Sequence, residues 1–312
     1  MRPNVEPAVL GSLAGLYVIL VVASLVVTWL CWRGPDKQCA ELVQRIRSWW
    51  IIVSLFSLAL VTSRYAAIVF FAVVSFLALK EYLSLVPTRR ADRQVLLCAY
   101  LSIPLQYYWV AQAWLGMFII FIPIYLFLLL PVCMALIGET REFLRAAGTL
   151  HWGIMTTVFG ISHAAYLLVL PLEKNPRAGG AGLVLFLVFL TQFNDVAQYL
   201  WGSLLGRHKI IPKVSPNKTW EGFFGGVGTT MLLAFALSGW LTPMRWQWAL
   251  VAGLLIAVGG YLGDVTISAL KRDIGVKNTG TLIPGHGGIL DRIDSLTYTA
   301  PLFFHFIYYL HY

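Results

Sequence analysis

The feature that most limits how this chain can fold is a series of ten long apolar segments covering most of its 312 residues. Most of them approach the roughly 17–25 residues that cross a bilayer as one helix. Solid apolar runs, without in-and-out alternation, argue against a transmembrane β-barrel. We therefore expect an all-α fold, a polytopic integral membrane bundle of about nine or ten helices, with apolar segments near 8–31, 49–63, 65–79, 95–112, 113–137, 151–171, 181–202, 222–241, 246–267 and 294–312.

The composition agrees with a membrane protein. Hydrophobic residues make up 59% of the chain and charged residues 12%, against roughly 25% charged residues in ordinary soluble domains. Soluble and disordered classes are therefore excluded. The four cysteines lack metal-site spacing and predict no disulfide framework, so we assign no role to Cys31, Cys39, Cys98 or Cys133.

The stretch 49–79 suits either one tilted helix or two short helices broken near Ser63-Arg64. Loop charges favour the break. With it, and with the N-terminus outside, the basic loops all lie on the cytoplasmic side, whereas a single helix would export the two most basic late loops. These loops lie near 32–48, 80–94, 138–150, 203–221 and 268–293. The net charge of +9 follows from this topology, and attraction for anionic lipid or nucleotide phosphates can add to it.

Polar residues are concentrated near the C-terminus. We expect one membrane domain, 1–312, in which residues 1–190 are mainly scaffold helices and residues 191–312 are a catalytic half with phosphate-binding loops. Thr191, Asp195 and Gln198 fall on one face of an otherwise apolar helix. A carboxylate there marks either a functional site or a structural hydrogen-bond cluster between helices.

The loop Gly206–Gly222 carries four closely spaced cations, which suit either a polyphosphate or ordinary juxtamembrane charge: Arg207, Lys209, Lys213 and Lys218. Lys218-Thr219 lacks the glycine pattern of a P-loop, so that interpretation fails.

The richest stretch begins at Gly263. In a helix, Asp264, Ser268 and Lys271 share a face, and Asp291 and Asp294 share a face of the next helix. A proline and three glycines between them can bring backbone N–H groups near phosphates. Carboxylates that hold Mg²⁺, beside Lys271, Arg272, Lys277 and Arg292, indicate a phosphate-handling site.

These motifs resemble the phosphatidate cytidylyltransferases, also called CDP-diacylglycerol synthases. The resemblance covers about 70–100 residues of the C-terminal half. It rests on Asn194-Asp195, on Ser215-Pro-Asn-Lys218-Thr219-Trp-Glu221-Gly222, and on Ser268-x-x-Lys271-Arg272 followed by Lys277 and Pro-Gly-His286-Gly287-Gly288-Ile-Leu-Asp291-Arg292-Ile-Asp294.

The resemblance implies transfer of CMP from CTP to phosphatidic acid or a related lipid phosphate, which yields CDP-diacylglycerol and pyrophosphate, with Mg²⁺ and room for a second cation. The implied partners are CTP, the lipid phosphate and membrane lipids, with no nucleic acid; a homodimer stays open. The implied location is a bacterial inner membrane, with the active site on the cytoplasmic side.

The resemblance also suggests a role for individual residues. Asp264 and Asp291 are expected to bind metal, with Asp294 and Asp195 in support. Asp264, Lys271, Asp291 and His286 form the expected catalytic set. The expected substrate-binding residues are Ser215, Lys218, Lys271, Arg272, Lys277, Gly287, Gly288 and Arg292.

One residue departs from the pattern. The family usually has Lys-Asp where this chain has Lys277-Asn278. Asn keeps an acceptor oxygen but loses a charge, so the change is benign if the residue only shapes a turn. If the family's Asp binds metal or a proton, the lipid acceptor differs or activity falls.

Three alternatives remain. A CTP-dependent polyprenol kinase would transfer the γ-phosphate and release CDP. A CDP-alcohol phosphotransferase would need an Asp-Gly-x-x-Ala-Arg pattern, which is missing. A transporter would use Asp195 and Asp264 for ion coupling, but we see no inverted repeat, and a permease has no need of the basic glycine-rich loops.

Overall fold

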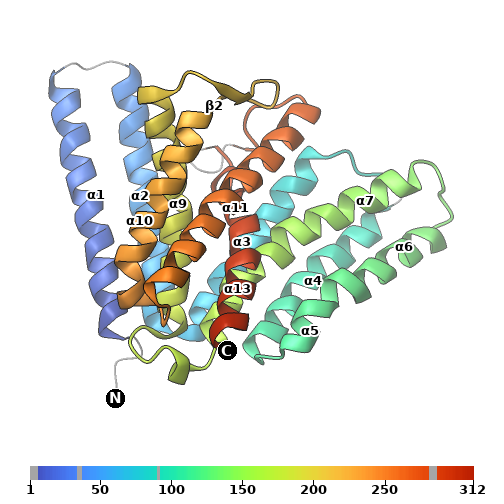
Figure 1. The fold of residues 1–312 in the computed structure, drawn as a ribbon. Helices are drawn as coiled ribbons and strands as arrows, with labels where there is room; N and C mark the ends of the chain where they lie inside the picture. The colour runs from blue at the N-terminus through green and yellow to red at the C-terminus, as the bar shows by residue number, and fades with distance from the viewer. Residues whose placement is uncertain (1–5, 34–36, 90–91, 281–286) are drawn as a thin grey trace.

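The computed structural model describes residues 6–33, 37–89, 92–280 and 287–312, and they form a helical bundle (Figure 1). The first part of the bundle comprises α1 (Pro7–Arg33), α2 (Lys37–Thr62), α3 (Arg64–Leu85), α4 (Arg93–Ala111), α5 (Leu115–Ile120), η2 (Phe121–Leu126), α6 (Phe127–Leu136), α7 (Phe143–Ile154), η3 (Met155–Gly160), α8 (Ile161–Tyr166), η4 (Leu167–Val169) and η5 (Leu172–Lys174). The remainder comprises α9 (Gly179–Leu205), β1 (Lys209–Ile211), β2 (Ser215–Thr219), α10 (Trp220–Leu241), α11 (Trp246–Asp273), α12 (Leu290–Ile293) and α13 (Leu296–His311).

Eight helical stretches within the described ranges are long and apolar enough to cross a membrane. Two of them are composite: α5, η2 and α6 form Leu115–Leu136, and α7 through η4 form Phe143–Val169. The helices α4 and α13 cover the other two predicted apolar segments. The all-α membrane fold predicted from the sequence is therefore confirmed.

The predicted break in the stretch 49–79 is also confirmed. Helix α2 ends at Thr62 and α3 begins at Arg64. Between them, Ser63 has an extended backbone, and its Oγ accepts a hydrogen bond from Ala66 N at 3.0 Å. This is the usual N-cap interaction, which satisfies one otherwise unpaired helix N–H.

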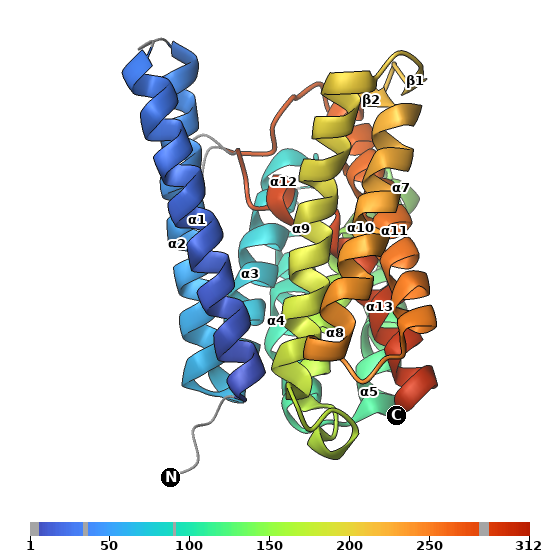
Figure 2. The ribbon, with the colours of Figure 1, turned by 60° about the vertical axis from the view of Figure 1, so that its left-hand side comes forward.

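The outer and inner helices differ in what they bury. Helix α1 exposes large apolar side chains such as Val18 and Leu25, as expected for a surface that meets lipid. In contrast, Leu183, Phe186 and Leu190 of α9 are fully buried. Helices α10, α11 and α13 lie around α9 (Figure 2). The bundle thus has an inner helix that can carry polar groups away from lipid.

The basic connections gather at one end of the bundle. The hairpin β1–β2 and the C-terminal ends of α3 and α11 lie at the upper end in Figure 1, whereas α1 begins and α13 ends at the opposite end. A common end for these three connections agrees with the loop-charge argument.

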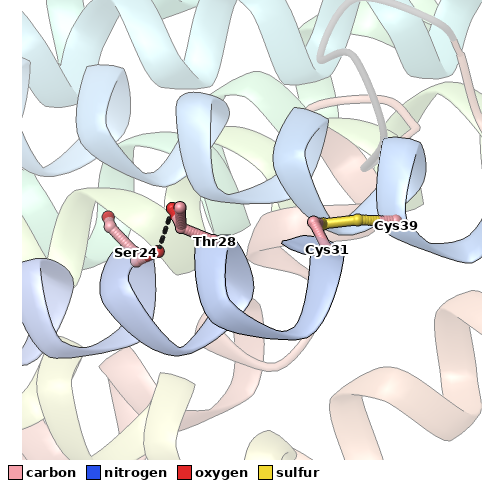
Figure 3. The surroundings of a disulfide bond; sticks show 4 residues. All are labelled: Ser24, Thr28, Cys31 and Cys39. Carbon is pink, nitrogen blue, oxygen red and sulfur yellow. Dashed lines mark hydrogen bonds between the residues drawn. A yellow bond between two sulfur atoms is a disulfide. The ribbon is translucent and has the colours of Figure 1, made fainter. Parts of the chain in front are cut away.

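Two local features differ from the sequence-based expectation. First, residues 209–219 form a short antiparallel hairpin, in which Lys209 pairs with Thr219 and Ile211 with Ser215. Second, Cys31 and Cys39 form a disulfide, so the prediction of no disulfide was wrong for this pair (Figure 3). The packing of α1 on α2 places their Cα atoms 5.5 Å apart, within disulfide range, which sequence spacing alone does not show.

Candidate active site

A cavity of about 190 Å³ lies among α9, α10, α11 and the β2 strand. Its walls carry charged, polar and aromatic side chains, among them Asp195, Gln198, Ser215, Lys218, Phe223, Tyr261 and Asp264. Ser215 and Lys218 of the hairpin and Asp264 of α11 are all predicted site residues. They therefore line one cavity together with Asp195 of α9.

Lys218 and Asp264, which both line this cavity, form an ion pair. Lys218 Nζ lies 2.6 Å from Asp264 Oδ2, and it also lies 4.7 Å from the centre of the Tyr261 ring. The other carboxylate oxygen of Asp264 accepts a hydrogen bond from Ser268 Oγ at 3.1 Å. The predicted face shared by Asp264 and Ser268 is thus confirmed.

Asp195 and Asp294 approach Asp264 from α9 and from the start of α13. Ser295 connects the two residues, because its Oγ donates to Asp195 Oδ1 at 3.0 Å and its backbone N–H donates to Asp294 Oδ1 at 2.8 Å. All three carboxylates are near enough for their charges to repel one another. Such a cluster attracts cations.

The close approach of α11 to this cluster depends on Gly263. A Cβ atom at this position would lie 2.4 Å from the backbone oxygen of Asp294 and 3.1 Å from Ser295 Cα. Only a glycine leaves room for both backbones, so the residue before Asp264 fixes how near Asp264 and Asp294 can come.

Asp291 belongs to a second cluster with a different lysine. Its Oδ1 accepts from Lys271 Nζ at 2.7 Å, and its Oδ2 accepts from the backbone N–H groups of Thr279 at 2.9 Å and Gly288 at 3.1 Å. Burial by itself would raise the pKa of Asp291, but the hydrogen bond and charge of Lys271 and the two N–H groups outweigh burial and lower that pKa below its usual value. Asp291 is therefore held as a carboxylate.

The hairpin is fastened at two points. Glu221 accepts from the backbone N–H groups of Arg207 at 3.1 Å and His208 at 3.2 Å. Arg272 Nε donates to the backbone oxygen of Val214 at 3.1 Å. Arg272, which the resemblance places at a substrate phosphate, thus also links α11 to the hairpin that carries Lys218.

The remaining predicted residues have varied surroundings. Lys277 is exposed, and Gly287 adopts φ +83° beside Asp291. The N–H of Gly288 donates to Asp291, and Arg292 contacts α9 through its backbone oxygen, which accepts from Gln192 Nε2 at 3.2 Å. His286 lies outside the described residues.

Three buried polar atoms around the site have no hydrogen-bond partner within the described part of the chain: Gln198 Nε2, Tyr261 OH and Arg292 Nε. Gln198 and Tyr261 line the cavity, and the charge of Arg292 acts on Asp195. Buried donors normally have partners. Their presence here fits a cavity that receives an anionic ligand such as a phosphate.

The residues also fit the Mg²⁺ that the family resemblance implies, because carboxylate oxygens are its preferred protein ligands. Among the described residues, however, no three His, Cys, Asp or Glu side chains already form a cation cage. In the structure, Asp264 pairs with Lys218 and Asp291 pairs with Lys271. The group that it does bring together is Asp195, Asp264 and Asp294.

The sequence reasoning did not find Glu81 on α3. Its carboxylate accepts hydrogen bonds from Ile289 N at 2.9 Å and Leu290 N at 3.0 Å, directly before Asp291. Nothing in the sequence near Glu81 signals this contact, because its partners lie about two hundred residues away along the chain.

Comparison with known proteins gives a consistent result. The family described as "Cytidylyltransferase family" matches residues 43–310. The uncharacterized protein YnbB of Escherichia coli is 48% identical over 298 residues, which are 96% of this chain and 98% of that protein. The phosphatidate cytidylyltransferases of Staphylococcus epidermidis and Staphylococcus aureus are each 39% identical over 127 residues, which are 40% of this chain and 49% of theirs. The match to these staphylococcal proteins thus spans about half of their length.

Proposed function

This chain belongs to the cytidylyltransferase family, and from that premise we propose that it transfers CMP from CTP to a lipid phosphate. Phosphatidic acid is the acceptor that the similar staphylococcal proteins suggest by name. The products are then CDP-diacylglycerol and pyrophosphate.

The observation that carries this proposal is the pairing of Lys218 with Asp264 beside Asp195 and Asp294, around a cavity with unpartnered donors. A nucleoside triphosphate brings several anionic oxygens and travels with a divalent cation. Lysines can take the oxygens and carboxylates can take the cation. A site with both groups is suited to that pair of ligands.

In the proposed reaction, an anionic oxygen of the lipid phosphate attacks the α-phosphorus of CTP. The bond from this phosphorus to the bridging oxygen breaks, and that oxygen leaves with pyrophosphate. The attacking oxygen is already an anion, so no Ser or Cys nucleophile and no proton abstraction is needed. The protein's task is positioning and charge stabilisation.

Lys218 and Lys271 are placed to supply that stabilisation. Each now neutralises a carboxylate, Asp264 and Asp291 respectively, at 2.6 and 2.7 Å. When phosphates bind, each ammonium group can exchange its carboxylate partner for a phosphate oxygen, with charge-assisted hydrogen bonds. Ser215, on the wall of the same cavity, can donate its hydroxyl to a phosphate oxygen.

Mg²⁺, when bound, would neutralise the triphosphate and polarise the reacting phosphorus. Asp264, Asp195 and Asp294 are the residues that we assign to hold it, and Asp291 is the remaining carboxylate of the predicted set. We place this end of the bundle on the cytoplasmic side of a bacterial inner membrane, where CTP is available, because the basic connections gather there.

The test uses purified protein in detergent with CTP labelled on either the α- or the γ-phosphate, and a panel of lipid phosphates. We expect the α-label in the lipid fraction, release of pyrophosphate, and the highest rate with phosphatidic acid. Transfer of the γ-label with release of CDP would instead identify a CTP-dependent lipid kinase. No transfer of either label to any lipid would refute the proposal.

A further inference from the structure

Both carboxylate oxygens of Glu81 accept hydrogen bonds from residues that lie about two hundred positions away in the sequence. Its Oε2 accepts from the backbone N–H of Ile289 at 2.9 Å, and its Oε1 accepts from the backbone N–H of Leu290 at 3.0 Å. The hydroxyl of Thr279 also donates to Glu81 Oε1. One carboxylate on α3 therefore holds both flanks of the glycine-rich segment.

The glycines of this segment make room for Glu81. A Cβ at Gly288 would lie 2.0 Å from Glu81 Oε1, and a Cβ at Gly280 would lie 3.0 Å from Glu81 Oε2. Any side chain at position 288 would displace the carboxylate. The glycine at this position is thus explained by the approach of Glu81 to the backbone.

Glu81 is connected to Asp291 by the same contacts. Thr279 Oγ1, which contacts Glu81, also lies 2.9 Å from Asp291 Oδ2, and Thr279 N donates to that same oxygen. In addition, Leu290, whose N–H donates to Glu81, is the residue directly before Asp291. The position of Asp291 therefore depends on Glu81 from two sides.

The short helix α12 cannot hold this position unaided. It has four residues, Leu290–Ile293, and only the N–H groups of its last two, Arg292 and Ile293, donate to a backbone oxygen of the same turn, that of Ile289. Glu81 supplies an acceptor for the N–H of Leu290, the first residue of the helix, and for that of Ile289 before it. A carboxylate accepts such bonds more strongly than a neutral oxygen does.

We propose that Glu81 is a positioning residue of the reaction. Through Thr279, Ile289 and Leu290 it holds the Asp291 carboxylate in the position where it pairs with Lys271. This inference rests on the proposed function for its kinetic consequence, but not for its structural one. It extends the site to α3, which belongs to the part of the chain predicted to be mainly scaffold helices.

The first experiment compares Glu81→Gln with Glu41→Gln as a matched control. The Gln side chain has nearly the same shape, but an NH₂ group replaces one of the two carboxylate oxygens. This NH₂ group cannot accept a hydrogen bond from the backbone N–H that faced the lost oxygen. Glu41 lies on α2 and is exposed, where it forms an ion pair with Arg45. We expect Glu81→Gln to lower kcat by about 10- to 100-fold, because small misplacements of a reacting group cost that much. The KM for CTP should change by less than about threefold, and Glu41→Gln should leave both constants unchanged.

A double variant separates positioning from a general loss of structure. If Glu81 acts through Asp291, then Glu81→Gln combined with Asp291→Asn is no slower than Asp291→Asn alone. Losses that multiply, or wild-type kcat in Glu81→Gln, would overturn the proposal. A melting temperature in detergent is recorded for every variant, since a purely structural role would lower it along with activity.

Hydrogen exchange gives a readout that needs no activity. In Glu81→Gln, the amides of Ile289 and Leu290 should exchange at least about tenfold faster, while amides of α9 stay protected, because the bonds lost are local. Unchanged exchange at these two amides would contradict the anchoring role. If the wild-type protein shows no nucleotidyl transfer, the proposed function fails, and the exchange result still decides whether Glu81 anchors the segment.

Discussion

The Lys218 ammonium and the Asp264 carboxylate lie 2.6 Å apart, so a β strand and a membrane helix share one ion pair at the edge of the cavity. The exposed fractions of the two side chains are 15% and 28%. Breaking a partly buried pair leaves two charges that need new partners. A phosphate for Lys218 together with a cation for Asp264 would satisfy both at once, which couples the binding of nucleotide and metal.

The first prediction concerns Asp264. Asp264→Asn should lower turnover of CTP by at least about 100-fold, because it removes a charge at the reacting phosphates. Asp273→Asn is the matched control: Asp273 ends the same helix but lines a different cavity, beside Trp152 and Leu270. Its turnover should stay within about twofold of wild type. Pyrophosphate release is measured for both, and equal activity of the two variants would contradict the assignment.

The second prediction concerns the metal. Chelation with EDTA should abolish transfer, and Mg²⁺ should restore it fully. Asp195→Asn should raise the Mg²⁺ concentration needed for half-maximal rate by about tenfold, since it removes one of three mutually repelling carboxylates that a cation would neutralise. An unchanged Mg²⁺ dependence would exclude Asp195 from the metal site.

Much of the fold could be predicted because its signals are local or additive. The apolar runs give the helices, and the charges of the loops place the break at Ser63, where the structure caps α3. Helical periodicity likewise placed Ser268 beside Asp264. The hairpin was missed because its strands, Lys209–Ile211 and Ser215–Thr219, are too short to show alternation.

The grouping of the carboxylates could not be predicted in the same way. Spacing put Asp291 and Asp294 on one helical face, yet Asp291 pairs with Lys271 whereas Asp294 lies near Asp195 and Asp264. That division depends on how α12 is anchored, and the anchor is Glu81 on α3. No local pattern marks a lone glutamate whose partners come from a distant part of the chain.

The third prediction tests the close approach of α11 to the start of α13. Gly263→Ala should destabilise the protein by about 1–3 kcal/mol, because the added Cβ meets backbone atoms that cannot move independently. Gly228→Ala on α10 has no atom within 4 Å of its new Cβ and should not lower stability. Thermal unfolding in detergent measures both. A melting temperature of Gly263→Ala equal to that of Gly228→Ala would mean that the two backbones are not in contact.

The fourth prediction concerns sidedness. In a variant whose four cysteines are replaced by serine, we introduce Lys213→Cys in the hairpin and, as a control, Lys174→Cys in η5, both at exposed positions. A membrane-impermeant maleimide should label position 213 only from the cytoplasmic side and position 174 only from outside. The reverse pattern would place the site outside. It would also put the Cys31–Cys39 disulfide on the oxidising side, where disulfides usually persist.

The fifth prediction concerns Asn278, which replaces the family's usual Asp. Asn278 is exposed, and Gly287 lies next to it, with the Cβ that would be built on the glycine 3.6 Å from Asn278 Cβ. Both Asn and Asp suit such a turn. Asn278→Asp should therefore change kcat with phosphatidic acid by less than about threefold. An increase of tenfold or more would mean that the missing charge takes part in the reaction, and a changed order of preference among lipid phosphates would assign residue 278 to acceptor selection.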